Sequence, residues 1–138
     1  MPTPDWFRHL LAVSDVLADR DRAEITSWRG GADDTADEDD VPPLSLRLAA
    51  LATAFAERSA ELTPERTAEM FRILEEVQRS GGEYDRTAVA TGFFEALLNA
   101  WDEGFALQAV WAYMGPESRA HCLAWNRFAG IDSPDWMR

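Results

Sequence analysis

The stretch DRTAVATGFFEALLNAWDEG, residues 85–104, decides the fold class. Its apolar side chains recur at intervals of three or four residues: Val89, Phe93, Phe94, Leu97, Leu98 and Trp101. This spacing places them on one wide stripe of an α-helix, and the stripe stops before Gly104. We therefore predict a helix here, with Asp85 as its N-cap.

Three further helices are predicted in the N-terminal half. The first begins with Thr3 as N-cap and continues to a stop at residues 28–31. The second follows the proline pair at 42–43 and is apolar on more than one side, so we expect it to be central. The third begins at Thr63-Pro64 and ends at Gly81-Gly82. Their stripes supply the expected core: Trp6, Leu10, Val13, Leu17, Leu44, Leu48, Leu51, Phe55, Met70, Phe71, Leu74 and Val77.

Two more helices are predicted after residue 104. One runs from about Phe105 to Met114, and the other from Pro116 to about Ala129, closing on Gly130. The tail is expected to dock through Ile131 or Trp136. No window alternates as a half-buried strand would. The predicted fold is all-α, a single domain over residues 1–138 formed by an irregular bundle of five or six helices joined by short turns.

An acidic Gly/Asp/Pro-rich loop, residues 30–43, separates the first two predicted helices. Within it the run ADDTADEDD, residues 32–40, has no aliphatic side chain larger than alanine. Such a run is typical of a solvated loop. Two interpretations stay open, a solubilising loop or an electrostatic docking element for a basic partner, with Trp28 as a possible aromatic anchor.

Composition excludes several classes of function. The formal net charge is -12, and all thirteen bases are arginine, which disfavours direct nucleic-acid binding and removes lysine chemistry. With a single cysteine, no intramolecular disulfide can form, and the cysteine and two histidines show no metal-ligand spacing. We predict no cofactor, no metal and no membrane association. Since the N-terminus is interpreted as a helix rather than a signal peptide, a cytoplasmic location is expected.

Catalysis is not expected from the polar residues. Glu75 and Glu76 are adjacent on a helix and do not converge, so solvated positions explain them better. Ser118, His121 and Asp132 lack a nucleophile elbow. Glu95, Arg119 and His121 are expected to form an inter-helix polar cluster, with a structural ion pair between Glu95 and Arg119.

The C-terminal half resembles a known group of proteins. The matching features are a Phe-Glu-x-Leu helix, a Gly-Pro-x-x-Arg turn and a terminal Trp-x-x-Phe, here Phe94, Glu95, Leu97, Gly115, Pro116, Arg119, Trp125 and Phe128. It resembles small all-helical bacterial proteins, some of them encoded beside polymorphic toxins and treated as immunity proteins. The resemblance implies a toxin-neutralising protein and carries over no catalytic residue.

The leading prediction is a non-catalytic binding protein, an immunity- or antitoxin-type inhibitor that blocks a basic toxin or effector through an acidic surface. The alternatives are a nucleic-acid mimic or regulatory adaptor, and a small-ligand-binding helical domain. The oligomeric state is left open. The predicted partner-binding residues are Trp28, Asp33, Asp34, Asp37, Glu38, Asp39 and Asp40.

Overall fold

The computed structural model describes residues 3–30 and 39–138, and every regular element there is a helix, which confirms the all-α prediction. A π-helix, Ala88–Phe94, joins the helices Glu83–Thr87 and Glu95–Asp102 into one continuous helix. Single 3-10 turns lie at Ser59–Glu61 and Asp135–Met137. The α-helices are α1 (Asp5–Leu11), α2 (Asp15–Trp28), α3 (Leu44–Arg58), α4 (Pro64–Ser80), α5 (Glu83–Thr87), α6 (Glu95–Asp102), α7 (Gln108–Trp111) and α8 (Pro116–Ala129).

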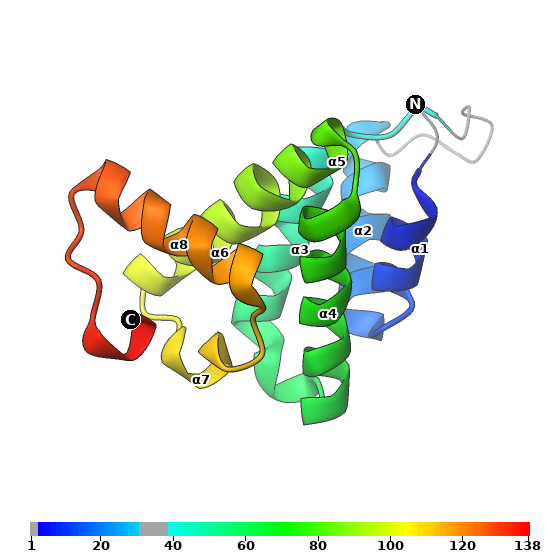
Figure 1. Cartoon of the computed structure of the whole chain (residues 1–138). Coiled ribbons are helices and arrows are strands. Elements are labelled where there is room, and N and C mark those ends of the chain that lie inside the picture. Colours follow the sequence, from blue (N-terminus) through cyan, green and yellow to red (C-terminus); the bar gives the residue numbers. More distant parts are fainter. Residues whose placement is uncertain (1–2, 31–38) are drawn as a thin grey trace.

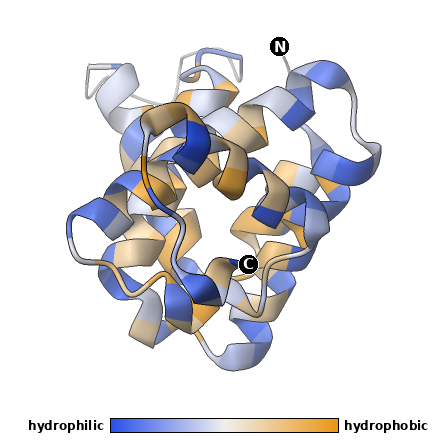
Figure 2. Cartoon of the chain, turned by 60° about the vertical axis from the view of Figure 1, so that its left-hand side comes forward, coloured by the Kyte–Doolittle hydropathy of each residue, from blue (hydrophilic) through white to orange (hydrophobic). Residues whose placement is uncertain are grey.

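The helices pack around α3. It lies between α2 and the continuous helix from α5 to α6, as the sequence predicted for the central helix (Figure 1). Helix α4 contacts α1, α5 and α8, and α8 also packs on α6 and on the π-helix. Apolar segments of the helices turn toward one another and polar segments turn outward (Figure 2). This arrangement leaves the C-terminal segment beside α6, α7 and α8.

One apolar core holds these helices together. Five phenylalanines are fully buried: Phe7, Phe55, Phe71, Phe93 and Phe94. Several meet edge to face, a geometry that aromatic rings prefer. Each buried side chain of this size stabilises the fold by about 1.5–3 kcal/mol. The predicted stripes of α3, α4 and the α5–α6 helix are confirmed as core.

The first predicted helix is in fact two helices, and its predicted N-cap is wrong. The break lies at residues 12–14, where the Ser14 side chain accepts a hydrogen bond from Val16 N and caps α2. Pro4, not Thr3, is the N-cap of α1. The Thr3 hydroxyl instead accepts a hydrogen bond from Arg47.

The helix that contains residues 85–104 begins earlier than predicted. Gly82 is its N-cap, so the prediction of Asp85 was wrong. Asp85 instead accepts a hydrogen bond from the Trp6 indole, 2.9 Å away, and ties this helix to α1. Gly92 faces α3 so closely that an added Cβ would lie 2.6 Å from Ser45 O. The π-helix therefore sits where α3 approaches most closely.

The C-terminal part differs from the prediction in two places. The helix predicted from about Phe105 to Met114 is α7, which has only four residues. Phe128 follows Trp125 by three residues, a spacing that favours a core position, but its side chain is 85% exposed. The tail docks as predicted through Trp136, whose ring meets Trp101 and Trp111 at 5.7 Å, and also through the buried Met137.

Candidate functional site

The junction of α4 and α8 is built on a carboxylate. Glu75 of α4 accepts hydrogen bonds from Glu117 N, Ser118 N and the Ser118 hydroxyl at 2.8–3.0 Å. The two backbone donors are the first amides of α8, where a helix carries partial positive charge. The interpretation of Glu75 as a solvated side chain was therefore wrong: it caps a helix more than forty positions later. Ser118 also accepts from Gln78, so its hydroxyl is occupied structurally.

The Gly-Pro-x-x-Arg turn serves the same junction. A Cβ on Gly115 would overlap the Glu75 side chain, so only glycine leaves room for the cap. Pro116 occupies the first turn of α8, where its missing N–H is not needed. Arg119 donates to Trp111 O, at 3.0 and 3.3 Å, and lies over the Trp111 ring. The motif thus joins α8 to α4 and α7.

The predicted cluster of Glu95, Arg119 and His121 is only partly assembled. Nε2 of His121 lies 3.3 Å from Oε2 of Glu95. Nε2 nevertheless has no hydrogen-bond partner among the described residues. Arg119 turns to α7 instead, and no Glu95–Arg119 ion pair occurs within residues 3–30 and 39–138; that expected pair was wrong.

A buried ion pair joins α3 to α2. The Arg47 guanidinium donates to both carboxylate oxygens of Asp21 at 2.8 and 2.9 Å, and a third N–H reaches Thr3. The same group lies 4.5 Å from the Phe7 ring centre. Arg47 also lines a neighbouring cavity. Because Asp21 compensates its charge, Arg47 does not act as an anion-binding group there.

That cavity, of about 300 Å³, lies between the N-terminal segment, the end of α2, residues 39–44 and α5. Two aromatic side chains line it and remain exposed, Trp28 at 50% and Tyr84 at 54%. The Trp28 indole donates to Asp40 at 3.2 Å, and Arg29 donates to the Asp40 carbonyl. We call Trp28, Asp39, Asp40, Val41 and Tyr84 the Trp28 face.

Only some of the predicted partner-binding residues lie in the part of the chain that the structure describes. Trp28, Asp39 and Asp40 come together on this face, whereas Asp33, Asp34, Asp37 and Glu38 lie outside the described residues. Tyr84 was not predicted, since it stands 56 positions from Trp28 in sequence with no periodic signal. Its neighbours Gly81-Gly82, which place the start of α5, were the only local hint.

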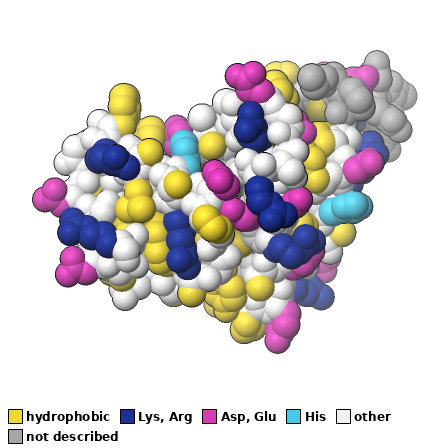
Figure 3. Space-filling model, viewed as in Figure 1, with side chains coloured by type: hydrophobic (Ala, Val, Ile, Leu, Met, Phe, Trp, Pro, Cys, Tyr) yellow, Lys and Arg dark blue, Asp and Glu magenta, His cyan; other side chains and the backbone are white. Residues whose placement is uncertain are grey.

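Other surfaces mix the two charges. Along α4, arginines and glutamates pair three residues apart, as Arg72 does with Glu69 and Arg79 with Glu76. Blue and magenta side chains accordingly lie next to one another over α4 in Figure 3. Arg72 lowers the pKa of Glu69, and Ser80 together with Arg79 lowers that of Glu76. This face has no uniform array of carboxylates.

The single thiol is buried. Cys122 of α8 is fully covered, and burial raises its pKa to about 12. Across the described ranges, no three Asp, Glu, His or Cys side chains gather as they would around a metal ion. None of the helices described there has the length and apolar run needed to cross a bilayer.

Comparison with known proteins identifies a family without assigning a role. A family model described as "Domain of unknown function (DUF7674)" matches residues 24–130. The chain belongs to the DUF7674 family. The match includes Trp28, the Glu75 cap and the whole of α8, but ends before the C-terminal segment. No curated protein and no solved structure matches the chain.

Proposed function

We propose that this DUF7674 protein is a non-catalytic, immunity- or antitoxin-type binding protein that blocks a functional surface of a basic partner protein. The observation that carries the proposal is the Trp28 face. Its two exposed aromatic rings flank a cavity, and Asp39 and Asp40 lie at its edge. Aromatic anchors with a charged rim are the usual composition of a binding hot spot.

Charge favours a basic partner. The whole chain has a net charge of -12, and residues 31–38 of the loop contribute four acids and no base. Such a field accelerates the encounter with a cationic protein and makes it sensitive to salt. Arg47, the cation beneath the cavity, is neutralised by Asp21, so it does not oppose such a partner. A reducing cytoplasm remains the expected site of action.

The alternative of a nucleic-acid mimic has less support. A mimic needs carboxylates at regular spacing on one face, and the carboxylates of α4 are interrupted by arginines. The ligand-pocket alternative based on Glu95, Arg119 and His121 is weakened because Arg119 points elsewhere.

The test is affinity capture from the native host with quantitative mass spectrometry. We expect one stoichiometric basic protein to be retained at low salt and released at high salt. The double variant Trp28→Ala/Tyr84→Ala should lose it, whereas Phe128→Ala, which removes an exposed ring elsewhere, should keep it. With the purified pair, each face variant should weaken binding about 30-fold, the size of a hot-spot residue.

Co-expression then tests the immunity role. The wild-type protein should restore growth of cells that express the captured partner, and the double variant should not. If no protein is captured, or if capture is the same for the double variant and Phe128→Ala, the proposal is wrong.

A further inference from the structure

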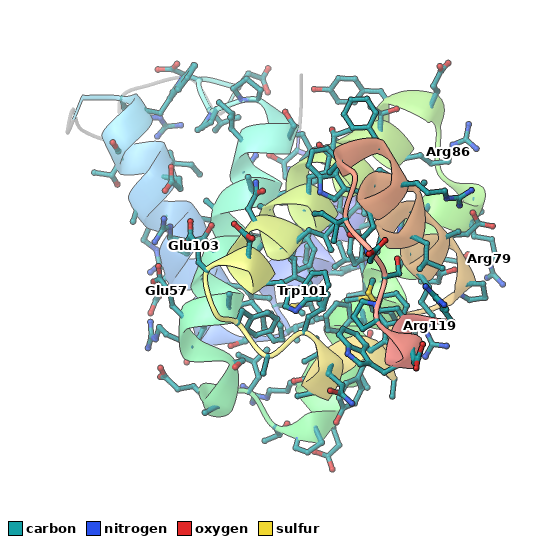
Figure 4. All side chains as sticks on the ribbon, turned by 90° about the vertical axis from the view of Figure 1, so that its left-hand side faces the viewer. Glu57, Arg79, Arg86, Trp101, Glu103 and Arg119 are labelled. Carbon is teal, nitrogen blue, oxygen red and sulfur yellow. The ribbon has the colours of Figure 1, made fainter. Side chains whose placement is uncertain are left out.

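A second hollow lies far from the Trp28 face, between α6, α8 and residues 131–134. Its volume is about 330 Å³, at the lower end of the range in which proteins hold small molecules. Figure 4 looks onto this side of the molecule, where Trp101 lies near the centre between α6 and the C-terminal segment. The side chains that matter below are Trp101, Asp102, Trp125, Asn126 and Asp132.

The end of α8 shapes this hollow. Gly130 takes a left-handed conformation, φ 72°, and Ile131 N returns to the Asn126 carbonyl at 2.8 Å. The chain therefore reverses and runs back beside α6. The Asn126 side-chain amide donates to the Ser133 hydroxyl at 3.1 Å, which holds the returning segment in place.

Asn126 also has an unused acceptor. The side chain is only 1% exposed, and its Oδ1 accepts no hydrogen bond among the described residues. A buried carbonyl oxygen without a partner costs roughly 1–3 kcal/mol. Asn126 belongs to the lining of the hollow, so a ligand there whose N–H reached this oxygen would remove that cost.

The charges around the hollow are negative. Asp102 and Asp132 belong to its lining, no basic side chain does, and neither carboxylate takes part in an ion pair within the described residues. Arg127 and Arg138 line a neighbouring hollow that shares Asp132, and Arg138 pairs there with Asp135 at 3.9 Å. Both tryptophans are partly exposed and offer ring surface.

We propose that this hollow binds an alkylammonium group. The cation would lie against the Trp101 and Trp125 rings, near the carboxylates of Asp102 and Asp132, and would donate an N–H to Asn126 Oδ1. Aromatic faces and carboxylates both attract such a cation, and its short apolar chain suits the remaining lining. Phosphate and carboxylate ligands are disfavoured by the same two aspartates.

The first test uses n-butylammonium chloride and the six tryptophan indole N–H signals in ¹⁵N NMR spectra, assigned with single Trp→Phe variants. We expect saturable shifts at Trp101 and Trp125, with a dissociation constant on the order of 1 mM, and none at Trp6 or Trp28. The neutral isostere 1-butanol should bind at least tenfold more weakly. Tetramethylammonium, which has the charge but no N–H, should also bind more weakly.

Variants that remove a charge test whether the ammonium group binds in this hollow. Asp102→Asn and Asp132→Asn change exposed residues, so the fold should persist, and each should weaken binding about threefold to tenfold. The matched control is Glu103→Gln, which removes the same charge one position from Asp102 but outside the lining. Absence of saturable shifts, equal binding of 1-butanol or tetramethylammonium, or an equal effect of Glu103→Gln would overturn the proposal.

A separate experiment tests whether the ammonium group belongs to a free amine or to a lysine side chain of a peptide. N-acetyl-lysine methylamide carries the same four-carbon ammonium chain on a peptide unit. Binding as tight as that of butylammonium would identify a peptide lysine as an acceptable ligand, and binding of butylammonium alone would identify a free amine. The Trp28-face variants serve as a further control and should leave these affinities unchanged, so this site and the partner surface can fail independently.

Discussion

Two polar junctions hold the helices in register, one buried and one partly exposed, and they are built differently. Arg47 and Asp21 join α3 to α2 through two opposite charges with almost no solvent access. Glu75 joins α4 to α8 through one charge and the amides at a helix end, and one of its donors, Glu117 N, belongs to an exposed residue. In the first junction each charge depends on the other, whereas in the second water can replace the carboxylate.

The largest effect is therefore expected for Asp21→Ala. It leaves the Arg47 guanidinium buried without its counter-charge, which should lower the free energy of unfolding by about 3–5 kcal/mol in urea denaturation. Asp19→Ala, which removes an exposed partner of Arg22, should cost less than about 0.5 kcal/mol. Equal costs for the two variants would show that the buried charge of Arg47 does not depend on Asp21. The pair replacement Asp21→Leu/Arg47→Met should recover most of the loss, because no lone charge remains.

A smaller effect is expected for Glu75→Ala. The amides of Glu117 and Ser118 lose their acceptor, but the exposed one can turn to water, so the expected cost is about 1–2 kcal/mol. Hydrogen exchange at these two amides should also accelerate. Glu76→Ala, at the exposed neighbouring position, is the control and should leave the free energy of unfolding essentially unchanged. A cost for Glu75→Ala as large as that for Asp21→Ala would contradict the distinction.

Gly115→Ala tests whether the glycine makes room for the Glu75 side chain or only forms the turn. The new methyl group displaces the Glu75 side chain, so the variant should lose about 1 kcal/mol in the wild-type background and almost nothing in Glu75→Ala. A double-mutant cycle measured by urea denaturation provides the coupling energy. Additive costs would show that the glycine serves the turn alone.

The smallest effect on the free energy of unfolding is expected for the pair of Glu69 and Arg72, which is exposed to solvent. Because Arg72 lowers the pKa of Glu69, the pair's contribution is present above the carboxyl's ordinary pKa of 4.5 and is lost as the pH falls through the lowered value. Arg72→Gln should move the Glu69 pKa back toward 4.5 in an NMR titration. Arg79→Gln should leave it in place, and neither should cost more than about 1 kcal/mol.

Local signals explain which helices the sequence predicted well. Helix α4 has Thr63-Pro64 at its start and Gly81 at its end, and both act as such in the structure. The break at Ser14 was missed because Leu10, Val13 and Leu17 keep helical spacing across it, although Ser14-Asp15 is itself a capping signal. The π-helix was invisible for a related reason: one extra residue per turn still leaves Phe93 and Phe94 buried.

The polar junctions and the candidate sites were beyond local signals. Arg47 meets Asp21 across 26 positions, and Glu75 meets α8 across more than forty, so no spacing rule connects them. The exposure of Phe128 could not be predicted either, because its spacing from Trp125 describes a stripe on α8 but not what covers that stripe. Trp28 could be selected as an exposed aromatic beside glycines, whereas its companion Tyr84 required the fold.

The rate at which a reagent labels the lone thiol of Cys122 measures how often the protein opens locally around α8. Thiol reagents attack the thiolate, which hardly forms while the pKa stands near 12, so labelling at neutral pH proceeds through states in which α8 has separated from the core. Since the chain has no other cysteine, the labelling rate reports that one event without any engineered probe. A ligand that binds between α8 and α6 would lower the labelling rate of Cys122. A partner that binds only the Trp28 face would leave that rate unchanged.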